Sequence, residues 1–594
     1  MESKKTIKKG SSDFKTIIED NGYFVDKTML IKEFFENGNY TLLIPRPKRF
    51  GKTLNLSMIE HFFDIQKPNS KKLFTEFKIT KDKVFCKEHQ NKYPVINISL
   101  KGIKETNWDK CLDKFKSLIS KLYSSHRYLL QSDKVEKDEK QIFENIISKT
   151  ANEAECKESL DSLCKYLKKH FNQKVIILVD EYDAPIINAF NNTNNPIKSD
   201  DKENKTYYEN VINFMQGFLG DAYKGNNDLK KGLLTGVLRV GRESIFSEWN
   251  NFEVYGITMP YFSDKFGFTK TETKDLLNYF GLNDRINDIQ KWYDGYIFED
   301  IKNIYNPWSI VSYITNPKAG FRPYWVNTGD PSLIKNRLTE YGVKEKIQDL
   351  IEGKIIEEEL YDNFVFADFE TDKELIWTLL TYNGYLTQAG KGKFGNYKLK
   401  IPNDEIKIVF KNIIMNWLKT KVRLKRDLLI RTSEYLLNNE IVKFEKGFRQ
   451  IIGDTISYFD TSKKTDKESK EIIIAPEQIY HVYTLGLLTI LSDDYIIKSN
   501  RESFDGRYDI ILIPHDKTKN GIVIEIKQIE KQKENEEDKK FRERINNKIE
   551  NALSQIDRNE YYTELIVNKI KPENIIKLAI VFVGKKPYIN KLPE

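Results

Sequence analysis

The sequence predicts an α/β protein of several domains, with an N-terminal domain of alternating strands and helices and a smaller α/β domain at the C-terminus. Three segments carry this prediction. One apolar strand runs into Gly-Lys-Thr at residues 51–53, a second ends on two acids at residues 175–181, and a pair of apolar strands carries acidic residues within 509–527. Alternating βα units favour a parallel sheet covered by helices. The 594 residues suffice for two to four domains.

The first of these segments has the context of a phosphate-binding loop. An apolar strand over residues 40–45 enters a loop, and an apolar-rich helix follows Gly51, Lys52 and Thr53. In this context backbone N–H groups and the helix N-terminus cradle phosphates, Lys52 reaches the β- and γ-phosphates, and Thr53 binds Mg²⁺. The general motif, G-x-x-x-x-G-K-[ST], has glycine where this chain has Arg46. The motif is therefore degenerate, and we expect a loop of different shape.

Two later strands supply the partners that such a loop needs. Residues 175–181 read as a Walker B strand, in which Asp180 would hold Mg²⁺ through water and Glu181 would polarise the attacking water. The strand over 232–238 carries Thr235, a candidate sensor for the γ-phosphate. Arg239 and Arg242 follow it, and either could sense phosphate or simply belong to a basic loop.

The C-terminal strands carry the residues of a metal-dependent phosphodiesterase. One strand opens on Asp509, and the next carries Glu525 and Lys527. Side chains alternate along a strand, so Glu525 and Lys527 point to the same face. Carboxylate oxygens suit Mg²⁺, and a cation suits the place beside the attacking water and the scissile phosphate. The alternative is a surface hairpin that happens to carry an Asp and a Glu-x-Lys pair.

These strands match the PD-(D/E)XK nuclease pattern, and the sequence resembles that superfamily here. The resemblance implies one more acidic residue on a preceding helix, where Glu477 fits, and an accessory glutamine on the helix after the lysine strand, where Gln555 fits. Gln555 could equally be an ordinary surface glutamine. His481 shares a helix face with Glu477 and could be a structural histidine.

Over residues 13–562 the chain resembles the AAA-ATPase-like proteins that carry a C-terminal PD-(D/E)XK nuclease domain. The resemblance implies a P-loop NTPase (AAA-like) core with a helical lid, followed by a restriction-endonuclease-like PD-(D/E)XK α/β domain. Within that family an arginine at the position of Arg46 is the usual form. The motifs that carry the resemblance are Phe24-Val25-Asp26-Lys27-Thr28, the loop at residues 46–53, Val179-Asp180-Glu181-Tyr182-Asp183-Ala184-Pro185, Trp292-Tyr293-Asp294-Gly295-Tyr296 and Tyr305-Asn306-Pro307-Trp308-Ser309.

Motif positions and changes in composition suggest where the domains begin and end. The aromatic motifs at residues 292–296 and 305–309 either form a lid contact near the nucleotide or belong to a plain helical core. The mixed-charge run 528–548 is either a solvated face or a track for a phosphate backbone. We expect a disordered lead over 1–12, a P-loop domain over 13–255, a mainly helical lid or linker over 256–400, a helical connector over 401–470 and a nuclease-like domain over 471–594.

Composition narrows the class of protein without naming a substrate. The chain is 39% hydrophobic and 31% charged, as expected of a protein with sizeable cores and a soluble surface. The net charge of +8 is compatible with nucleic-acid binding without indicating it. The four cysteines lack paired metal-ligand spacing and suggest a reducing compartment. No secretory leader or long apolar run is visible, so we expect an intracellular, cytoplasmic protein, with a nuclear location left open.

The leading hypothesis from the sequence is an ATP-binding, Mg²⁺-dependent nuclease in which the nucleotide state gates cleavage. The expected partner is nucleic acid, DNA ahead of RNA. One alternative is an ATP-dependent molecular switch whose nuclease-like fold only binds nucleic acid or a protein. Another is an ATPase whose C-terminal domain recognises a substrate without cutting it.

Overall fold

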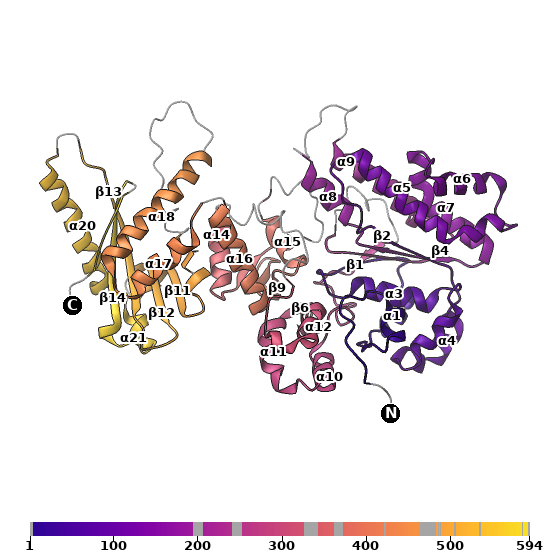
Figure 1. Cartoon of the computed structure of the whole chain (residues 1–594), viewed down its shortest axis with the longest axis horizontal. Coiled ribbons are helices and arrows are strands. Elements are labelled where there is room, and N and C mark those ends of the chain that lie inside the picture. The colour runs from indigo at the N-terminus through magenta and orange to yellow at the C-terminus, as the bar shows by residue number, and fades with distance from the viewer. Residues whose placement is uncertain are drawn as a thin grey trace. The chain divides into compact units, whose positions relative to one another are not determined.

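In a computed structural model, the chain forms two compact units (Figure 1). Met1–Val343 and Ile355–Ile406 make the N-terminal unit, and Lys344–Lys354 and Lys407–Glu594 make the C-terminal unit. No helix in the described part of the chain is long and apolar enough to cross a membrane. The structure describes residues 4–193, 206–239, 252–325, 343–361, 372, 374–420, 423–462, 483–484, 486–487, 489–503, 506–533, 536–584 and 586–591.

A five-stranded parallel sheet forms the centre of the N-terminal unit, in the order β2-β3-β4-β1-β5. Every residue of β1 and of β3 is buried, which explains their continuous apolar sequences, because helices cover both faces of such a sheet. The predicted α/β fold class is confirmed. The strands are β1 (Thr41–Pro45), β2 (Val95–Ser99), β3 (Val175–Asp180), β4 (Leu229–Gly236) and β5 (Phe252–Val254).

Helices lie on both sides of this sheet (Figure 1). Capping boxes begin several of them, such as Asn152 with Glu155 at α7 and Thr206 with Glu209 at α9. One side holds α1 (Phe14–Glu19), α3 (Lys52–Phe63) and α4 (Lys83–His89), near α2 (Met29–Glu36). The other holds α5 (Trp108–Ser125), α6 (Lys137–Ser148), α7 (Glu153–Phe171), α8 (Ala184–Asn192) and α9 (Tyr207–Tyr223). Short 3-10 helices connect them at Pro68–Phe74, Lys78–Lys81 and Arg127–Gln131.

The rest of the N-terminal unit combines helices with two small antiparallel sheets, which the sequence did not predict. One sheet is the hairpin β6–β7 and the other has the order β8-β10-β9. The elements are α10 (Lys270–Phe280), α11 (Ile286–Tyr293), β6 (Tyr296–Phe298), β7 (Ile301–Ile304), α12 (Pro307–Thr315), β8 (Ile356–Glu358), α15 (Leu375–Tyr382), β9 (Thr387–Lys391) and β10 (Tyr397–Lys400), with 3-10 turns at Asn283–Arg285 and Pro317–Ala319.

The motif at residues 292–296 contributes aromatic rings to the core of this region and also supplies two residues that fix its backbone. Asp294 accepts hydrogen bonds from Asn303 Nδ2 and from the N–H of Gly295, both at 2.6 Å. Gly295 has a φ of +99°, and a Cβ there would lie 2.0 Å from the carbonyl oxygen of Pro402. Only glycine therefore fits this crossing.

A buried carboxylate joins two of these segments. Glu405 is fully buried, and it accepts one hydrogen bond from Ser309 Oγ and one from the N–H of Trp325, both at 2.7 Å. Burial raises its pKa to about 7.

The C-terminal unit is built on a mixed five-stranded sheet in the order β11-β12-β13-β14-β15, in which only β13 and β14 run parallel. Helix α20 packs on β13 and β14 over an apolar cluster that includes Val523, Ile549 and Val581. The strands are β11 (Tyr495–Ser503), β12 (Gly506–Pro514), β13 (Gly521–Ile529), β14 (Ile575–Val583) and β15 (Lys586–Lys591). The helices of this unit are α17 (Arg426–Leu437), α18 (Ile441–Ser462), α20 (Asp538–Arg558) and α21 (Thr563–Val567), with a 3-10 turn at Pro572–Asn574. Helices α14 (Val343–Ile351) and α16 (Asp404–Thr420) begin in the N-terminal unit and continue into this one.

Candidate functional site

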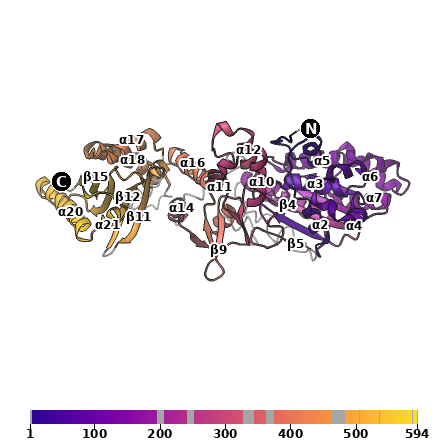
Figure 2. The ribbon, with the colours of Figure 1, turned by 90° about the horizontal axis from the view of Figure 1, so that it is seen from below.

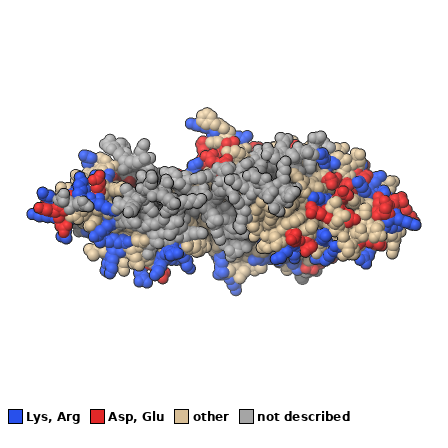
Figure 3. Space-filling view, turned by 90° about the horizontal axis from the view of Figure 1, so that it is seen from above, with Lys and Arg blue, Asp and Glu red and all other residues tan. Residues whose placement is uncertain are grey.

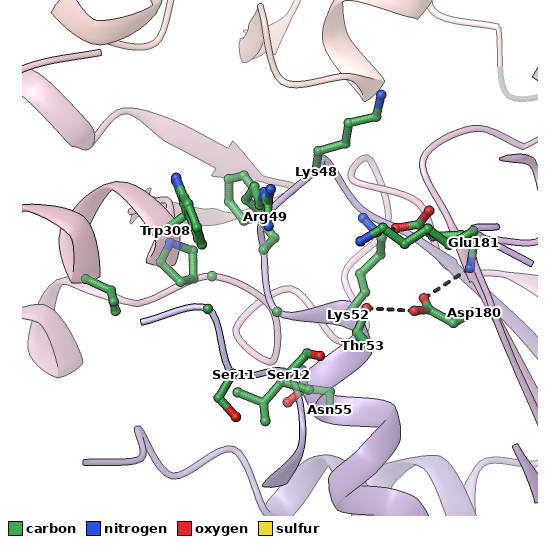
Figure 4. A pocket seen from close by; sticks show the side chains of 18 of the residues that line it. Ser11, Ser12, Lys48, Arg49, Lys52, Thr53, Asn55, Asp180, Glu181 and Trp308 are labelled. Atoms are coloured by element: carbon green, nitrogen blue, oxygen red, sulfur yellow. Dashed lines mark hydrogen bonds and ion pairs between the residues drawn. The ribbon is translucent and has the colours of Figure 1, made fainter. Parts of the chain in front are cut away.

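A cavity of about 700 Å³ opens in the N-terminal unit at the carboxyl ends of β1 and β3 (Figure 4). The predicted loop residues Gly51, Lys52 and Thr53 line it, together with Asp180 and Glu181. This is the size class of small-molecule sites. The structure thus brings together, at one place, five residues that the sequence analysis assigned to nucleotide binding.

The loop has the backbone geometry that an anion site needs. Gly51 caps α3 with a φ of +86°, a conformation that favours glycine, and α3 then points its N-terminal N–H groups toward the cavity. Lys52 is buried, and its Nζ donates to the carbonyl oxygens of Arg46 (2.8 Å) and Pro47 (2.9 Å). Burial lowers the pKa of Lys52 to about 8, against the opposing effect of Asp180 and other nearby carboxylates.

Asp180 is the centre of a hydrogen-bond network. Its Oδ2 accepts from Thr53 Oγ1 at 2.6 Å, and its Oδ1 accepts from Thr235 Oγ1 at 2.7 Å and from the N–H of Glu181 at 3.0 Å. Strand β4 lies between β1 and β3, so Thr235 at its end falls between the loop and Asp180. Thr53 and Asp180, predicted as the metal-binding pair, are therefore in direct contact, and the structure places Thr235 as the support of Asp180.

Glu181 lies at the same end of the cavity, beside Lys52 (Figure 4). Its φ of +49° is unusual for a residue with a side chain and marks a locally strained backbone. Burial and the charge of Asp180 raise the pKa of its carboxyl group. Lys101 Nζ lies 4.0 Å from Glu181 Oε1. Lys101 was not predicted, because no motif surrounds it in the sequence.

Asp183 is a second residue whose role was not predicted. It is buried, and its Oδ2 accepts from the N–H groups of Val237 (2.8 Å) and Leu238 (2.9 Å). It thereby holds the segment that follows β4 and leads to Arg239, which is half-buried. Arg242, the other predicted phosphate-sensing arginine, lies outside the described residues.

Arg46 is fully buried in a cage of backbone carbonyls. Its guanidinium donates to the carbonyl oxygens of Pro45 (2.9 Å), Tyr255 (2.6 Å), Tyr261 (3.4 Å) and Phe262 (3.2 Å). It also lies 5.4 Å from the ring centres of two phenylalanines, at positions 266 and 298. Burial lowers its pKa to about 9, so it stays charged at neutral pH. The sequence analysis placed Arg46 among the nucleotide-binding residues. In the structure its side chain holds the loop against the segment after β5, and Arg46 is not among the described residues that line the cavity.

The opposite end of the cavity is aromatic. Arg49 stacks its guanidinium over Trp308 at 4.2 Å from the ring centre, and Ser11 and Ser12 lie nearby (Figure 4). Trp308 Nε1 donates to the carbonyl oxygen of Tyr324 at 3.0 Å, which fixes the ring. Trp308 belongs to the motif at residues 305–309, for which the sequence left open a lid contact near the nucleotide or a plain helical core. The aromatic motifs therefore build a core and also reach the cavity.

The predicted phosphodiesterase residues also meet, at the centre of the sheet in the C-terminal unit. Strands β12 and β13 pair so that Asp509 Oδ2 accepts the N–H of Ile526 at 2.6 Å. Lys527 Nζ donates to Glu525 Oε1 at 2.7 Å, because both residues point to the same face. Burial and the charge of Asp509 raise the pKa of Glu525 to about 7, while Lys527 opposes this rise, and burial raises the pKa of Asp509.

Glu525 has the feature expected of a metal ligand. Only 2% of it is exposed, and its Oε2 has no hydrogen-bond partner among the described residues. A buried carboxylate oxygen without a partner is costly, and a bound cation would satisfy it. No cluster of three or more metal-binding side chains occurs within the described part of the chain, so Asp509 and Glu525 form a pair there.

Of the other residues named for this site, the structure describes Gln555. Glu477 and His481 lie outside the described residues. Gln555 Nε2 donates to the hydroxyl of Tyr561 at 3.0 Å, and Asn559 Nδ2 donates to the same hydroxyl at 2.9 Å. This arrangement favours a structural role for Gln555 at the end of α20.

Family models match both of the domains that contain these residues. A model of the family described as predicted AAA-ATPase matches residues 8–246, and a model of the PD-(D/E)XK nuclease superfamily matches residues 475–592. A protein of Azotobacter chroococcum mcd 1, described as an uncharacterized protein in the vnfD 5′ region, is 26% identical over 411 residues, which cover 68% of this chain and 69% of that protein.

A solved structure of a Walker-type ATPase from Pyrococcus abyssi aligns with a TM-score of 0.34 and 13% identity, over 66% of this chain and 97% of that one. The two family matches confirm the architecture that the sequence resemblance implied. The chain therefore carries an AAA-ATPase-like domain and, in the same polypeptide, a domain of the PD-(D/E)XK nuclease superfamily.

Proposed function

We propose that the protein is a Mg²⁺-dependent phosphodiesterase that cuts nucleic acid and that ATP bound in its N-terminal unit controls the cutting. The observation that carries the proposal is Glu525, whose Oε2 is buried without a partner among the described residues, next to Asp509 and Lys527. A module that only binds nucleic acid has no need of this triplet.

In this mechanism Asp509 and Glu525 would hold the metal, with help from the carbonyl oxygen of Ile526. Bound Mg²⁺ would supply a Lewis acid and lower the pKa of a water molecule. Lys527, now paired with Glu525, would orient the attacking water and neutralise charge on the scissile phosphate. The water oxygen would attack phosphorus in line while the bond from phosphorus to one sugar oxygen breaks. The attacking water would give a proton to bulk solvent, and the departing sugar oxygen would take one up from solvent.

The cavity of the N-terminal unit fits a nucleoside triphosphate. Lys52 and the N-terminal N–H groups of α3 would hold its phosphates, and Thr53 and Asp180 would hold Mg²⁺. Glu181 would position the water that attacks the γ-phosphate. The base would lie toward Trp308, at the opposite end of the cavity.

The experiment is cleavage of labelled single- and double-stranded DNA and of RNA, with Mg²⁺ or Mn²⁺, with and without ATP. Glu525→Gln keeps the volume of the side chain and should abolish cutting, and Lys527→Ala should do the same. Glu530→Gln is the matched control, because Glu530 is exposed and directly follows the same strand. If Glu525→Gln cuts like the wild type, the assignment of the site is wrong.

Two further readouts separate the alternatives. Mn²⁺ should raise the melting temperature of the wild type, and this rise should vanish in Asp509→Asn. Lys52→Ala should lose ATP binding and, if nucleotide controls the nuclease, the ATP dependence of cutting. A protein that binds ATP and nucleic acid but cuts no substrate would favour the switch that only binds.

A further inference from the structure

The hairpin β9–β10 in the N-terminal unit projects from its small sheet (Figure 2). Its tip carries Phe394, whose aromatic ring is fully exposed. The tip is a two-residue turn, Phe394 and Gly395, with φ values of +53° and +86°. The N–H of Asn396 donates to the carbonyl oxygen of Lys393 at 3.0 Å, and the N–H of Gly392 donates to that of Asn396 at 2.7 Å. These bonds close the hairpin.

The conformation of this turn disfavours phenylalanine, so the stability of the fold does not explain why Phe394 is there. Tight hairpin turns with two positive φ values favour Asn-Gly or Asp-Gly, because those residues tolerate the left-handed region. Phe394 bears the strain of that region and is fully exposed, so its ring contributes nothing to a core. An aromatic ring in this position is best explained by a partner that covers it.

The strands on either side of the turn are basic. Lys391 and Lys393 are exposed next to Phe394, and neither has an ion pair with a carboxylate among the described residues. Lys398 and Lys400 follow on β10. Basic and acidic side chains are interspersed over the wider surface (Figure 3). At the hairpin, Glu357 of the neighbouring strand β8 accepts from the N–H of Lys393 at 3.4 Å, so the lysines there outnumber the carboxylate that contacts the turn.

We propose that this hairpin binds single-stranded nucleic acid, with the ring of Phe394 stacked on an unpaired base and Lys391 and Lys393 on flanking phosphates. A flat ring beside cations is the arrangement that single-strand binders use, and stacking tolerates any base. A single ring would anchor the protein only weakly in a lipid surface. This inference rests on the proposed function, because it names the form of nucleic acid that the protein holds.

Binding is measured by fluorescence anisotropy with the full chain in EDTA, so that no cutting occurs, on single-stranded DNA, single-stranded RNA and a blunt DNA duplex. Phe394→Asn puts a residue suited to the turn at the tip, so the protein should be at least as stable as the wild type. We expect it to bind single strands about tenfold more weakly, whereas Phe394→Trp should keep the affinity.

The lysines are tested by the salt dependence of binding. Lys391→Gln with Lys393→Gln should lower the slope of log K against log salt by about 1.4, at about 0.7 per phosphate contact on a single strand. The matched control is Lys110→Gln with Lys121→Gln, two exposed lysines on α5, which lies away from the hairpin (Figures 1 and 2).

Three results would overturn the inference. The first is a Phe394→Asn protein that binds like the wild type, and the second is a wild type that binds no single strand. The third is binding to phosphatidylserine vesicles that depends on Phe394 while binding to nucleic acid does not. Cleavage by the wild type with Mn²⁺, measured separately, tests the proposed nuclease whichever result is found.

Discussion

Replacing Arg46 with glycine would give the loop the residue that the general phosphate-binding motif has at this position. We expect the change to damage the site. In the structure the Arg46 side chain is fully buried and donates to the carbonyl oxygens of Pro45, Tyr255, Tyr261 and Phe262. Glycine provides none of these donors and leaves the space empty.

The size of the effect follows from these contacts. A buried polar group that loses its partner costs ~1–3 kcal/mol, so the two shorter bonds alone predict a loss of ~2–6 kcal/mol in the free energy of unfolding. They are the bonds to Tyr255 (2.6 Å) and Pro45 (2.9 Å). For a unit of the size of the N-terminal one, such a loss lowers the melting temperature by roughly 2–7 °C.

The assay is thermal unfolding together with calorimetric titration of ATP, on Arg46→Gly, Arg46→Met and Arg46→Lys. Methionine fills much of the volume without donors, and lysine keeps the charge and part of the donor set. We therefore expect stability to fall in the order wild type, Lys, Met, Gly, and ATP affinity to fall with it. A glycine variant as stable as the wild type that binds ATP equally well would refute this reasoning.

Three further predictions concern the same unit. Because burial raises the pKa of Glu405 from 4.5 to about 7, the folded protein holds this proton more tightly than the unfolded chain. The contribution of Glu405 to the free energy of unfolding is therefore complete below pH 4.5 and falls as the pH rises toward 7, by up to about 3 kcal/mol. Chemical denaturation at pH 5 and pH 8 should show that Glu405→Gln removes this loss. Gly295→Ala should prevent folding or lower the melting temperature sharply, because its Cβ would meet the carbonyl oxygen of Pro402 at 2.0 Å, whereas Gly38→Ala, with open space around it, should not. Trp308→Ala should weaken ATP binding by roughly tenfold while leaving tripolyphosphate binding unchanged in calorimetry, since the ring lies at the end of the cavity far from Lys52.

The parts of the fold that sequence could predict are those set by burial and by short-range spacing. Strands β1 and β3 are buried along their whole length and so read as continuous apolar runs. Glu525 and Lys527 share a face because they are two residues apart on one strand. Gly51-Lys52-Thr53 lie at the start of a helix, as expected from the apolar strand before them and the apolar-rich segment after them. The positions of these residues were predictable from local geometry alone.

The rest depends on contacts between distant segments. Three of the four acceptors of Arg46, the carbonyl oxygens of Tyr255, Tyr261 and Phe262, lie more than 200 residues away in the chain. No local pattern could therefore show that its side chain occupies a cage of backbone carbonyls. Asp183 looked like one more acid after a strand until its bonds to Val237 and Leu238 were seen. Trp308 reaches the cavity only because the segment that carries it folds back on the loop.

The position of β4 between β1 and β3 also bears on how the protein can be made. Thr53 and Asp180 are brought into contact by a strand that ends at Gly236, so a nascent chain that has emerged only as far as Asp180 lacks the strand that unites them. Pairing across such long stretches of chain is intrinsically slow. Nearly the whole N-terminal sheet must therefore be synthesised before a bound nucleotide could stabilise the fold. Fragments that end between Asp180 and Gly236 should be substrates for chaperones and proteases.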